Sequence, residues 1–133
     1  MPQHGVELMA MLNYNDRMFH STAAETTAAD GTGVVGHYRQ DGDVIWGEFT
    51  GGRVARGSLA GTCGADGVIH FAYCQVLTDS SVMAGLCTSI PTVLTDGRIR
   101  LEEHWERFAP HAGSGISILE EALPPAPVPA GGG

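Results

Sequence analysis

The sequence predicts an all-β protein, an up-and-down meander of antiparallel strands that closes into a barrel of eight or nine strands. Turn residues recur along the chain, in the stretches QDGD at 40–43, TGGR at 50–53, GADG at 64–67, LTDS at 77–80 and LTDG at 94–97. The runs between them, about ten residues long, are rich in Val, Ile, Thr and aromatic residues, which favour strands. An Asp-Gly pair in a short loop favours a hairpin with a positive φ at the glycine, so consecutive strands should be antiparallel neighbours.

These turns set the limits of each expected strand. The central strands cover Val34–Gln40, Val44–Thr50, Val54–Gly61, Val68–Leu77, Val82–Ile90 and Arg98–Phe108. Two more are expected before them, around Val6–Tyr14 and Arg17–Ser21, and one after them, around Gly115–Glu121. The stretch STAAETTAADGTG at 21–33 is a low-complexity connection, which we expect to be mobile and to lie over one end of the barrel as a lid.

Closure of the meander is favoured because it leaves no unpaired edge strand and buries one face of every strand. A barrel of the lipocalin or avidin kind is therefore the predicted architecture, and a two-sheet sandwich is the alternative. At 133 residues the chain fits one domain, which we expect to occupy residues 1–123. Residues 124–133, PPAPVPAGGG, are expected to form a disordered tail.

Charge and cysteine content narrow the partners and the compartment. The formal net charge is −8 and the seven Lys and Arg residues are scattered, so the sequence shows no basic stripe for nucleic acid or an anionic membrane surface. Cys63, Cys74 and Cys87 cannot all pair and the chain starts without a signal peptide, so we expect reduced thiols in the cytoplasm. The six histidines show no metal-ligand spacing, and the sequence indicates no metal and no cofactor.

The stretch RIRLEEHWERF at 98–108 has two unlike faces at the two-residue period of a strand. One face is charged throughout apart from a histidine, which indicates exposure to solvent. The other consists of Ile99, Leu101, Glu103, Trp105 and Arg107. If this face lines the barrel, removal of water from around Glu103 raises its pKa, as a general acid or base near neutral pH requires. The alternative is a buried ion pair of Glu103 with Arg107 or Arg53.

Inner faces are predicted for three other strands, two of them from side-chain size and turn length. Val68–Leu77 should point its larger side chains inward, namely Ile69, Phe71, Tyr73 and Gln75. A three-residue loop at 78–80, which we favour, then pairs Phe71 with Cys87 and sends Cys87 inward, whereas a two-residue loop would send Leu86 and Thr88 inward. In Val44–Thr50 we expect Ile45, Gly47 and Phe49 inside.

Five stretches, YNDRMF, GHYRQDGDVIWGEFTGGRVARGSLAG, YCQV, GLCTSIP and DGRIRLEEHW, resemble a family of small bacterial proteins that often carry the label N-acetylglutamate synthase. The resemblance covers most of the chain. An acetyltransferase of the usual kind holds the pyrophosphate of acetyl-coenzyme A in a Gly-rich loop at a helix N-terminus, and this sequence shows neither feature. We therefore do not expect N-acetyl transfer.

The candidate site gathers the inward side chains. The predicted catalytic residues are Glu103 and Tyr73, and the predicted ligand-binding residues are Tyr38, Phe49, Phe71, Gln75, Cys87, Leu101, Trp105 and Arg107. The buried tyrosines and Gln75 would orient a polar group of an otherwise apolar ligand, and anchoring of a tyrosine hydroxyl to the backbone is the structural alternative. We interpret Cys87 as a small hydrophobic residue, because a nucleophilic thiol needs a base nearby and no histidine is expected on an inner face.

Three functions fit such a barrel. The first is a cofactor-independent isomerase, cyclase or dehydratase that acts on an apolar metabolite, with Glu103 as the acid or base. The second is a carrier or sequestering protein for a hydrophobic small molecule, with Glu103 paired to an arginine or holding a ligand amine. The third is a barrel with a filled interior. An apolar stripe of Val82, Ala84 and Leu86 further indicates a homodimer of barrels packed side by side.

Overall fold

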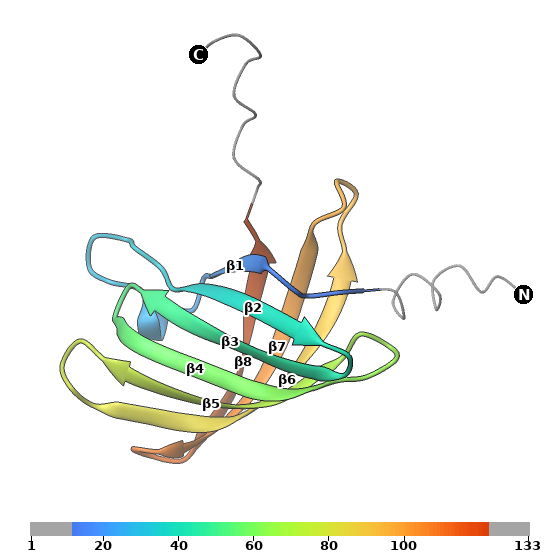
Figure 1. Cartoon of the computed structure of the whole chain (residues 1–133). Helices are drawn as coiled ribbons and strands as arrows, with labels where there is room; N and C mark the ends of the chain where they lie inside the picture. The colour runs from blue at the N-terminus through green and yellow to red at the C-terminus, as the bar shows by residue number, and fades with distance from the viewer. Residues whose placement is uncertain (1–11, 123–133) are drawn as a thin grey trace, which may run out of the picture.

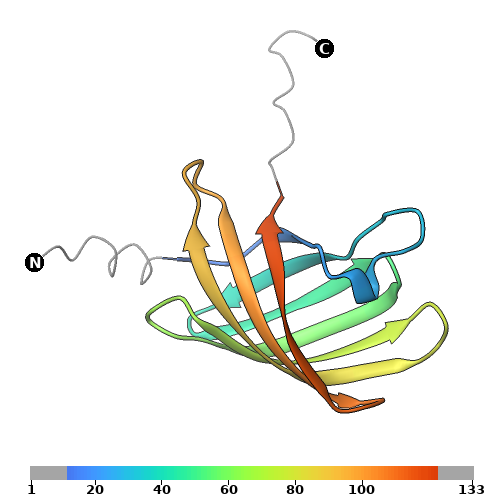
Figure 2. The same ribbon diagram turned by 180° about the vertical axis from the view of Figure 1, so that it is seen from behind.

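The computed structural model of the chain describes residues 12–122 and shows one closed barrel of eight antiparallel strands, each paired with its neighbour in sequence (Figures 1 and 2). This confirms the up-and-down barrel and excludes the two-sheet sandwich. The strands are β1 (Arg17–Ser21), β2 (Val35–Asp41), β3 (Val44–Gly51), β4 (Val54–Cys63), β5 (Ile69–Leu77), β6 (Val82–Val93), β7 (Ile99–Ala109) and β8 (Gly113–Glu121). Among the described residues, no helix is long and apolar enough to cross a membrane.

Every strand expected within 15–122 is confirmed, with differences only at the ends. Of the strand expected around Val6–Tyr14, only residues 12–14 are described, and they form no strand. The start of the expected domain and the expected tail at 124–133 lie outside the described residues. β6 runs past Pro91, beyond the expected end at Ile90; there it pairs with β7 alone, since its pairing with β5 ends at Ser89.

The five predicted turns all contain a residue with a positive φ: Gly42 (61°), Gly51 and Gly52 (101° and 57°), Gly67 (80°), Ser80 (71°) and Gly97 (88°). Between β5 and β6, the N–H of Leu77 donates to the carbonyl of Ser81 at 2.9 Å, which confirms the three-residue loop. Phe71 therefore pairs with Cys87, and Tyr73 pairs with Gly85. The inner faces expected for β3, β5 and β7 are also confirmed by the alternation of burial along these strands.

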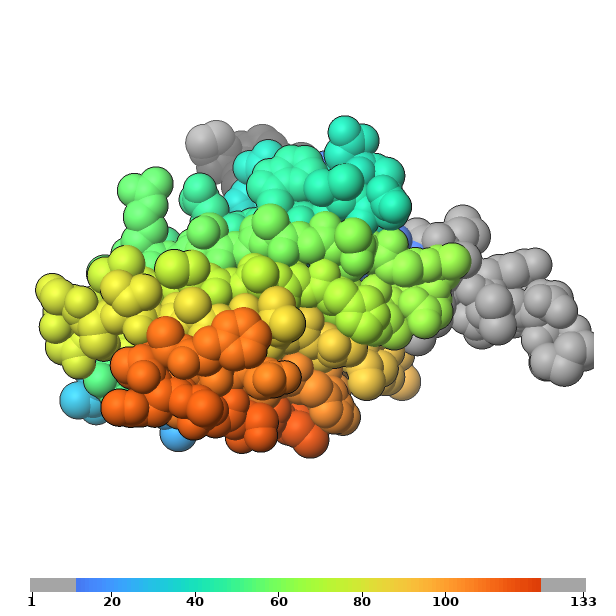
Figure 3. Space-filling view, turned by 90° about the horizontal axis from the view of Figure 1, so that it is seen from below, coloured from blue at the N-terminus to red at the C-terminus, as the bar shows by residue number. Residues whose placement is uncertain are grey.

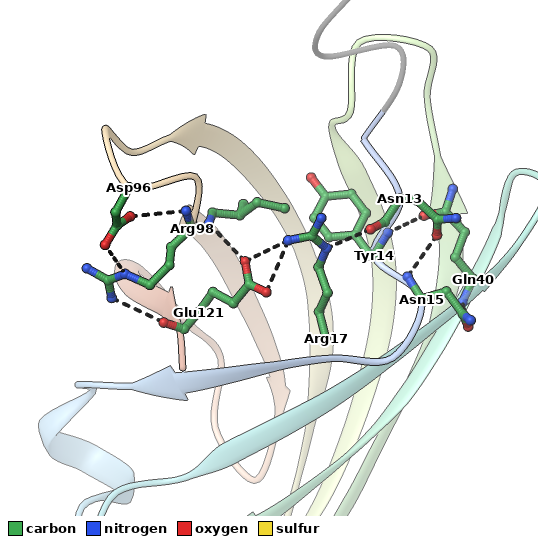
Figure 4. A network of polar contacts seen from close by, with 9 residues as sticks. Asn13, Tyr14, Asn15, Arg17, Gln40, Asp96, Arg98 and Glu121 are labelled. Atoms are coloured by element: carbon green, nitrogen blue, oxygen red, sulfur yellow. Dashed lines mark hydrogen bonds and ion pairs between the residues drawn. The ribbon is translucent and has the colours of Figure 1, made fainter. Parts of the chain in front are cut away.

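Side chains fill the interior at one end of the barrel, called here the packed end. The fully buried large side chains Tyr14, Tyr38, Ile45, Ile69, Ile99 and Leu101 gather there, close to the β2–β3, β4–β5 and β6–β7 turns. Tyr14 closes this end, because its hydroxyl donates to the carbonyl of Gly67 at 2.6 Å. Its N–H donates to Oε1 of Gln40 at 2.9 Å, a contact that Figure 4 shows. The opposite end carries the β1–β2 connection and is not filled in this way.

The seam between β1 and β8 is short and is reinforced by Glu121. Only three residue pairs join these strands, from Phe19–Glu121 to Ser21–Leu119. The carboxylate of Glu121 accepts hydrogen bonds from Nη1 of Arg17 at 2.8 and 3.0 Å and from the N–H of Ile99 at 3.1 Å. Figure 4 shows this carboxylate between Arg17 and β7. Glu121 thereby ties β1, β7 and β8 together where the barrel closes.

Candidate functional site

A cavity of about 450 Å³ opens at the less filled end of the barrel. Its volume lies in the range of small-molecule sites. The apolar lining comes from Ala23, Ala24, Val34, Phe49, Phe71, Met83, Cys87, Trp105, Ile116, Ile118 and Leu119, and the polar lining from Ser21, Thr22, Glu25, Thr26, Tyr73, Gln75, Glu103, Arg107 and Ser117. The barrel is therefore hollow at one end, and the filled-interior hypothesis fails for the described residues.

The connection between β1 and β2 lies at the mouth of this cavity, as expected of a lid. It contains a short 3-10 helix, η1 (Ala24–Thr26), drawn in blue at the left of Figure 1. Arg53, from the β3–β4 turn, holds η1 in place: its backbone N–H donates to the carbonyl of Thr26 at 2.8 Å, and its Nη1 donates to the carbonyl of Glu25 at 3.1 Å. The lid is therefore anchored to the rim of the barrel on one side.

Glu103 points from β7 into the barrel and is only 9% exposed. Two hydroxyls donate to its Oε2: Ser89 from β6 at 2.9 Å, and Tyr38 from β2 in a longer contact of 3.4 Å. Neither of the two arginines that the sequence suggested as ion-pair partners pairs with Glu103. Arg107 pairs with Glu25, and Arg53 lies 3.9 Å from Asp79. The buried ion-pair interpretation of Glu103 is therefore wrong, and the carboxyl group has only neutral partners.

This environment sets the protonation of Glu103. Removal from water raises the pKa of Glu103 to about 7, and hydrogen bonds from Ser89, Tyr38 and the thiol of Cys87 offset part of that increase. Both hydroxyl groups donate to Oε2. Glu103 itself lines the cavity. Near neutral pH, a ligand in the cavity can meet either a carboxylic acid or a carboxylate.

Tyr73 and Gln75 line the cavity from β5. Within residues 12–122, neither the hydroxyl of Tyr73 nor the side-chain amide of Gln75 has a hydrogen-bond partner, and neither group is fully buried. Burial raises the pKa of Tyr73 to about 12, so its hydroxyl stays protonated. Both side chains can therefore hold a carbonyl or hydroxyl group of a ligand.

Glycines opposite the large inward side chains keep the centre of the cavity open. A Cβ atom on Gly85 would lie 2.7 Å from the hydroxyl of Tyr73, and one on Gly115 would lie 2.5 Å from Cζ2 of Trp105. Both glycines face these residues across a strand pair. The missing side chains leave room for these aromatic rings beside the backbone, as in other sheets where an aromatic side chain covers a glycine.

The structure brings most of the predicted site residues together around the cavity: Glu103, Tyr73, Phe49, Phe71, Gln75, Cys87, Trp105 and Arg107. Tyr38 and Leu101 do not line it. They are fully buried in the packed end beneath the cavity floor, because the alternation of a strand decides which face is inside but not how deep in the barrel a residue lies. Tyr38 still contacts the site through its hydrogen bond to Glu103.

Several polar residues of the site were missed in the sequence, among them Ser89, Ser117 and Glu25. Ser89 is fully buried and bonds to Glu103, and its position two residues after inward Cys87 was the signal that could have found it. Ser117 accepts a hydrogen bond of 3.0 Å from Nε1 of Trp105. Glu25 lies in the low-complexity stretch, where no strand periodicity shows the direction of a side chain.

The cysteines and histidines add no further chemistry to the cavity. Burial, together with the nearby Glu103, raises the pKa of the Cys87 thiol, so it stays protonated and a poor nucleophile. Cys63 ends β4, two residues beyond the expected end of this strand at Gly61, and is buried. In the part of the chain that the structure describes, no three His, Cys, Asp or Glu side chains gather in a group that could hold a metal ion.

Comparison with known proteins agrees with the barrel. Residues 12–122 match the model of a family described as Avidin-like protein, which covers more than half of the chain. A search of curated proteins found no match. The avidin-like fold binds small molecules, and the cavity described above lies inside such a barrel. By fold, cavity and family match, this chain belongs to the avidin-like proteins.

Proposed function

We propose that this barrel is a cofactor-independent enzyme that isomerises, cyclises or dehydrates an apolar small molecule by acid–base catalysis. The observation that carries the proposal is the carboxyl group of Glu103, whose pKa of about 7 and place in the lining of a largely apolar cavity suit it to give and take a proton there. A carboxyl group that served only packing would be paired with a cation or replaced by an apolar side chain.

Isomerisation, cyclisation and dehydration share one requirement: protons move, and no other group is transferred to a second substrate. Glu103 donates a proton to an oxygen or carbon of the substrate, or removes one, while Ser89 and Tyr38 stabilise the carboxylate that forms. Tyr73 and Gln75 hold a carbonyl or hydroxyl group of the substrate. The aromatic walls exclude water and restrict the substrate to one folded conformer.

The test uses a cellular metabolite extract as the source of ligands. The extract is incubated with the wild-type protein, and both bound and free compounds are analysed by liquid chromatography with mass spectrometry. We expect one apolar compound to decrease while a compound of equal mass, or of mass lower by one water, accumulates. A compound that is bound but recovered unchanged identifies a carrier and contradicts the proposed enzyme.

The decisive variant is Glu103→Gln, which keeps the shape of the side chain and removes the proton transfer. We expect it to bind the same compound and to lose at least about a hundredfold in turnover, the usual contribution of a general acid or base. Ser117→Ala is the matched control, because this hydroxyl lines the cavity but contacts Trp105 rather than Glu103. Equal turnover by Glu103→Gln would exclude Glu103 as the acid or base.

We also propose that two barrels pair side by side through the outer face of β6. Val82, Leu86 and Ile90 are 43–49% exposed on this strand, and Val76 on β5 adjoins them. Figure 3 shows the strands of this side next to one another, from green through yellow to orange. Light scattering should detect a dimer that Leu86→Glu dissociates. A monomer at high protein concentration would contradict this pairing.

A further inference from the structure

Arg107 is the one basic residue among those that line the cavity in the described part of the chain, in a protein of net charge −8. Its side chain is 19% exposed. Nε donates to the carbonyl of His111 at 2.9 Å, and the guanidinium carbon lies 5.6 Å from the centre of the Trp105 ring. These contacts hold the guanidinium group in one place at the mouth.

The anion that Arg107 meets belongs to the lid. Nη1 of Arg107 contacts Oε1 of Glu25 in an ion pair, and the side chain of Glu25 is 47% exposed. Within residues 12–122, Nη2 of Arg107 has no hydrogen-bond acceptor, and it is not fully buried. The guanidinium group of Arg107 is thus paired through Nη1 with a half-exposed carboxylate, and its Nη2 donates to no acceptor.

We propose, on the basis of the function proposed above, that the ligand is an apolar carboxylic acid whose carboxylate replaces that of Glu25 on Arg107. Its apolar body then lies along Trp105 and Phe71, and its reacting end reaches Glu103. A ligand carboxylate can accept from both Nη1 and Nη2 in the paired geometry that arginine favours, whereas Glu25 uses only Nη1. Entry of the ligand releases the ion pair that holds the lid on this side.

The spacing on β7 sets the length of such a ligand. Glu103, Trp105 and Arg107 follow one another on the inner face, and four residues of a strand span about 13 Å, the length of an extended chain of about ten carbons. A molecule of this size fits a cavity of about 450 Å³. The acid at the floor and the arginine at the mouth can therefore contact opposite ends of one molecule.

Decanoate and decan-1-ol are the probes, because they share an apolar chain and differ in charge. Binding is followed by tryptophan fluorescence in a Trp46→Phe background, in which Trp105 is the remaining tryptophan, at about pH 6, where decanoate is ionised. We expect decanoate to bind about tenfold more tightly than decan-1-ol. Arg107→Met should abolish this preference and leave the affinity for decan-1-ol unchanged.

Glu25→Gln provides the second measurement, since it removes the competing carboxylate. We expect the affinity for decanoate to rise about fivefold and that for decan-1-ol to stay the same. Arg53→Gln is the matched control for Arg107→Met: it also removes one positive charge, from a residue that holds the same lid but does not line the cavity, so the preference for decanoate should remain.

The inference is overturned if the alcohol binds as tightly as the acid, if neither probe binds, or if Glu25→Gln leaves the affinity for decanoate unchanged. Tighter binding of decyl phosphate than of decanoate would also overturn it, since the site would then select another anion. Loss of the carboxylate preference does not affect the role of Glu103, which is tested by turnover. Conversely, a preference for decanoate without any conversion in the metabolite extract supports this inference and contradicts the enzyme.

Discussion

Ser89 donates a hydrogen bond of 2.9 Å to Glu103 from the directly opposite position on the neighbouring strand. Both side chains point into the barrel, and Ser89 is fully buried. A hydroxyl group can stabilise a carboxylate without neutralising it. This pair therefore keeps the pKa of Glu103 near neutrality, between the higher pKa that burial alone would give and the lower one that an arginine partner would give.

Ser89→Ala should raise the pKa of Glu103 further, because the hydrogen bond from Ser89 favours the ionised form. Loss of one hydrogen bond to the carboxylate corresponds to a rise of about one unit in the pKa of Glu103. The side-chain carboxyl carbon of Glu103, titrated by NMR, reports the pKa directly. Ser117→Ala, whose hydroxyl bonds to Trp105, should leave it unchanged. An unaltered pKa in Ser89→Ala would show that Ser89 does not stabilise the carboxylate.

The stability of the wild-type protein should fall as the pH rises through 7. The pKa of Glu103 is about 7 in the folded chain and near 4.5 when it is unfolded, so the folded state binds the proton more tightly. Its contribution is fully present below pH about 4.5 and is lost as the pH rises through the folded pKa, a change of about 3 kcal/mol. Glu103→Gln has no titratable proton at this position, so its stability lacks this dependence on pH.

Urea unfolding of the wild type and of Glu103→Gln at several pH values between about 4 and 9 measures this contribution. The difference between the two proteins isolates Glu103 from the histidines, which titrate in both. We expect the free energy of unfolding of the variant, relative to that of the wild type, to increase by about 3 kcal/mol as the pH rises across this range. A constant difference would show that the folded pKa of Glu103 is not raised.

The direction of Glu103 could be predicted from the sequence because the two faces of β7 differ so clearly. A slip of one residue would have buried Arg100, Glu102 and Glu106, and the exposed face of the strand carries these charges in the structure. The pairing of Phe71 with Cys87 followed in the same way from the length of one turn. The two-residue alternation of a strand and the length of a turn were sufficient wherever the only question was whether a side chain points into or out of the barrel.

Depth along the barrel axis could not be predicted in this way. Leu101 and Glu103 are two residues apart on the same face, yet Leu101 belongs to the packed end and Glu103 to the cavity. Their depth depends on the tilt and stagger of strands in the closed barrel, which no single strand encodes. The position of Glu25 depends on contacts of the lid with Arg53 and Arg107, and these residues are distant in sequence.

Glu121→Gln should destabilise the barrel by about 1–3 kcal/mol, because it weakens the charge-assisted hydrogen bonds from Arg17 and Ile99 at the β1–β8 seam. Chemical denaturation measures the loss. Glu120→Gln is the control, since Glu120 is half exposed and lies 3.9 Å from Arg98 and Arg100, and should have little effect. Equal losses in the two variants would assign the effect to net charge rather than to closure of the seam.

Gly115→Ala should narrow the cavity without touching Glu103. The added Cβ would lie 2.5 Å from Cζ2 of Trp105, which pushes the indole toward the cavity and breaks its hydrogen bond to Ser117. Overpacking of this kind destabilises a protein by about 1–3 kcal/mol, and we expect the affinity for decan-1-ol to fall about tenfold. Ser117→Ala removes the same hydrogen bond but adds no atom, so its cavity should still bind the probe. If Gly115→Ala binds decan-1-ol as the wild type does, the ring of Trp105 does not form the wall of the site, and the open space in front of it must have another cause.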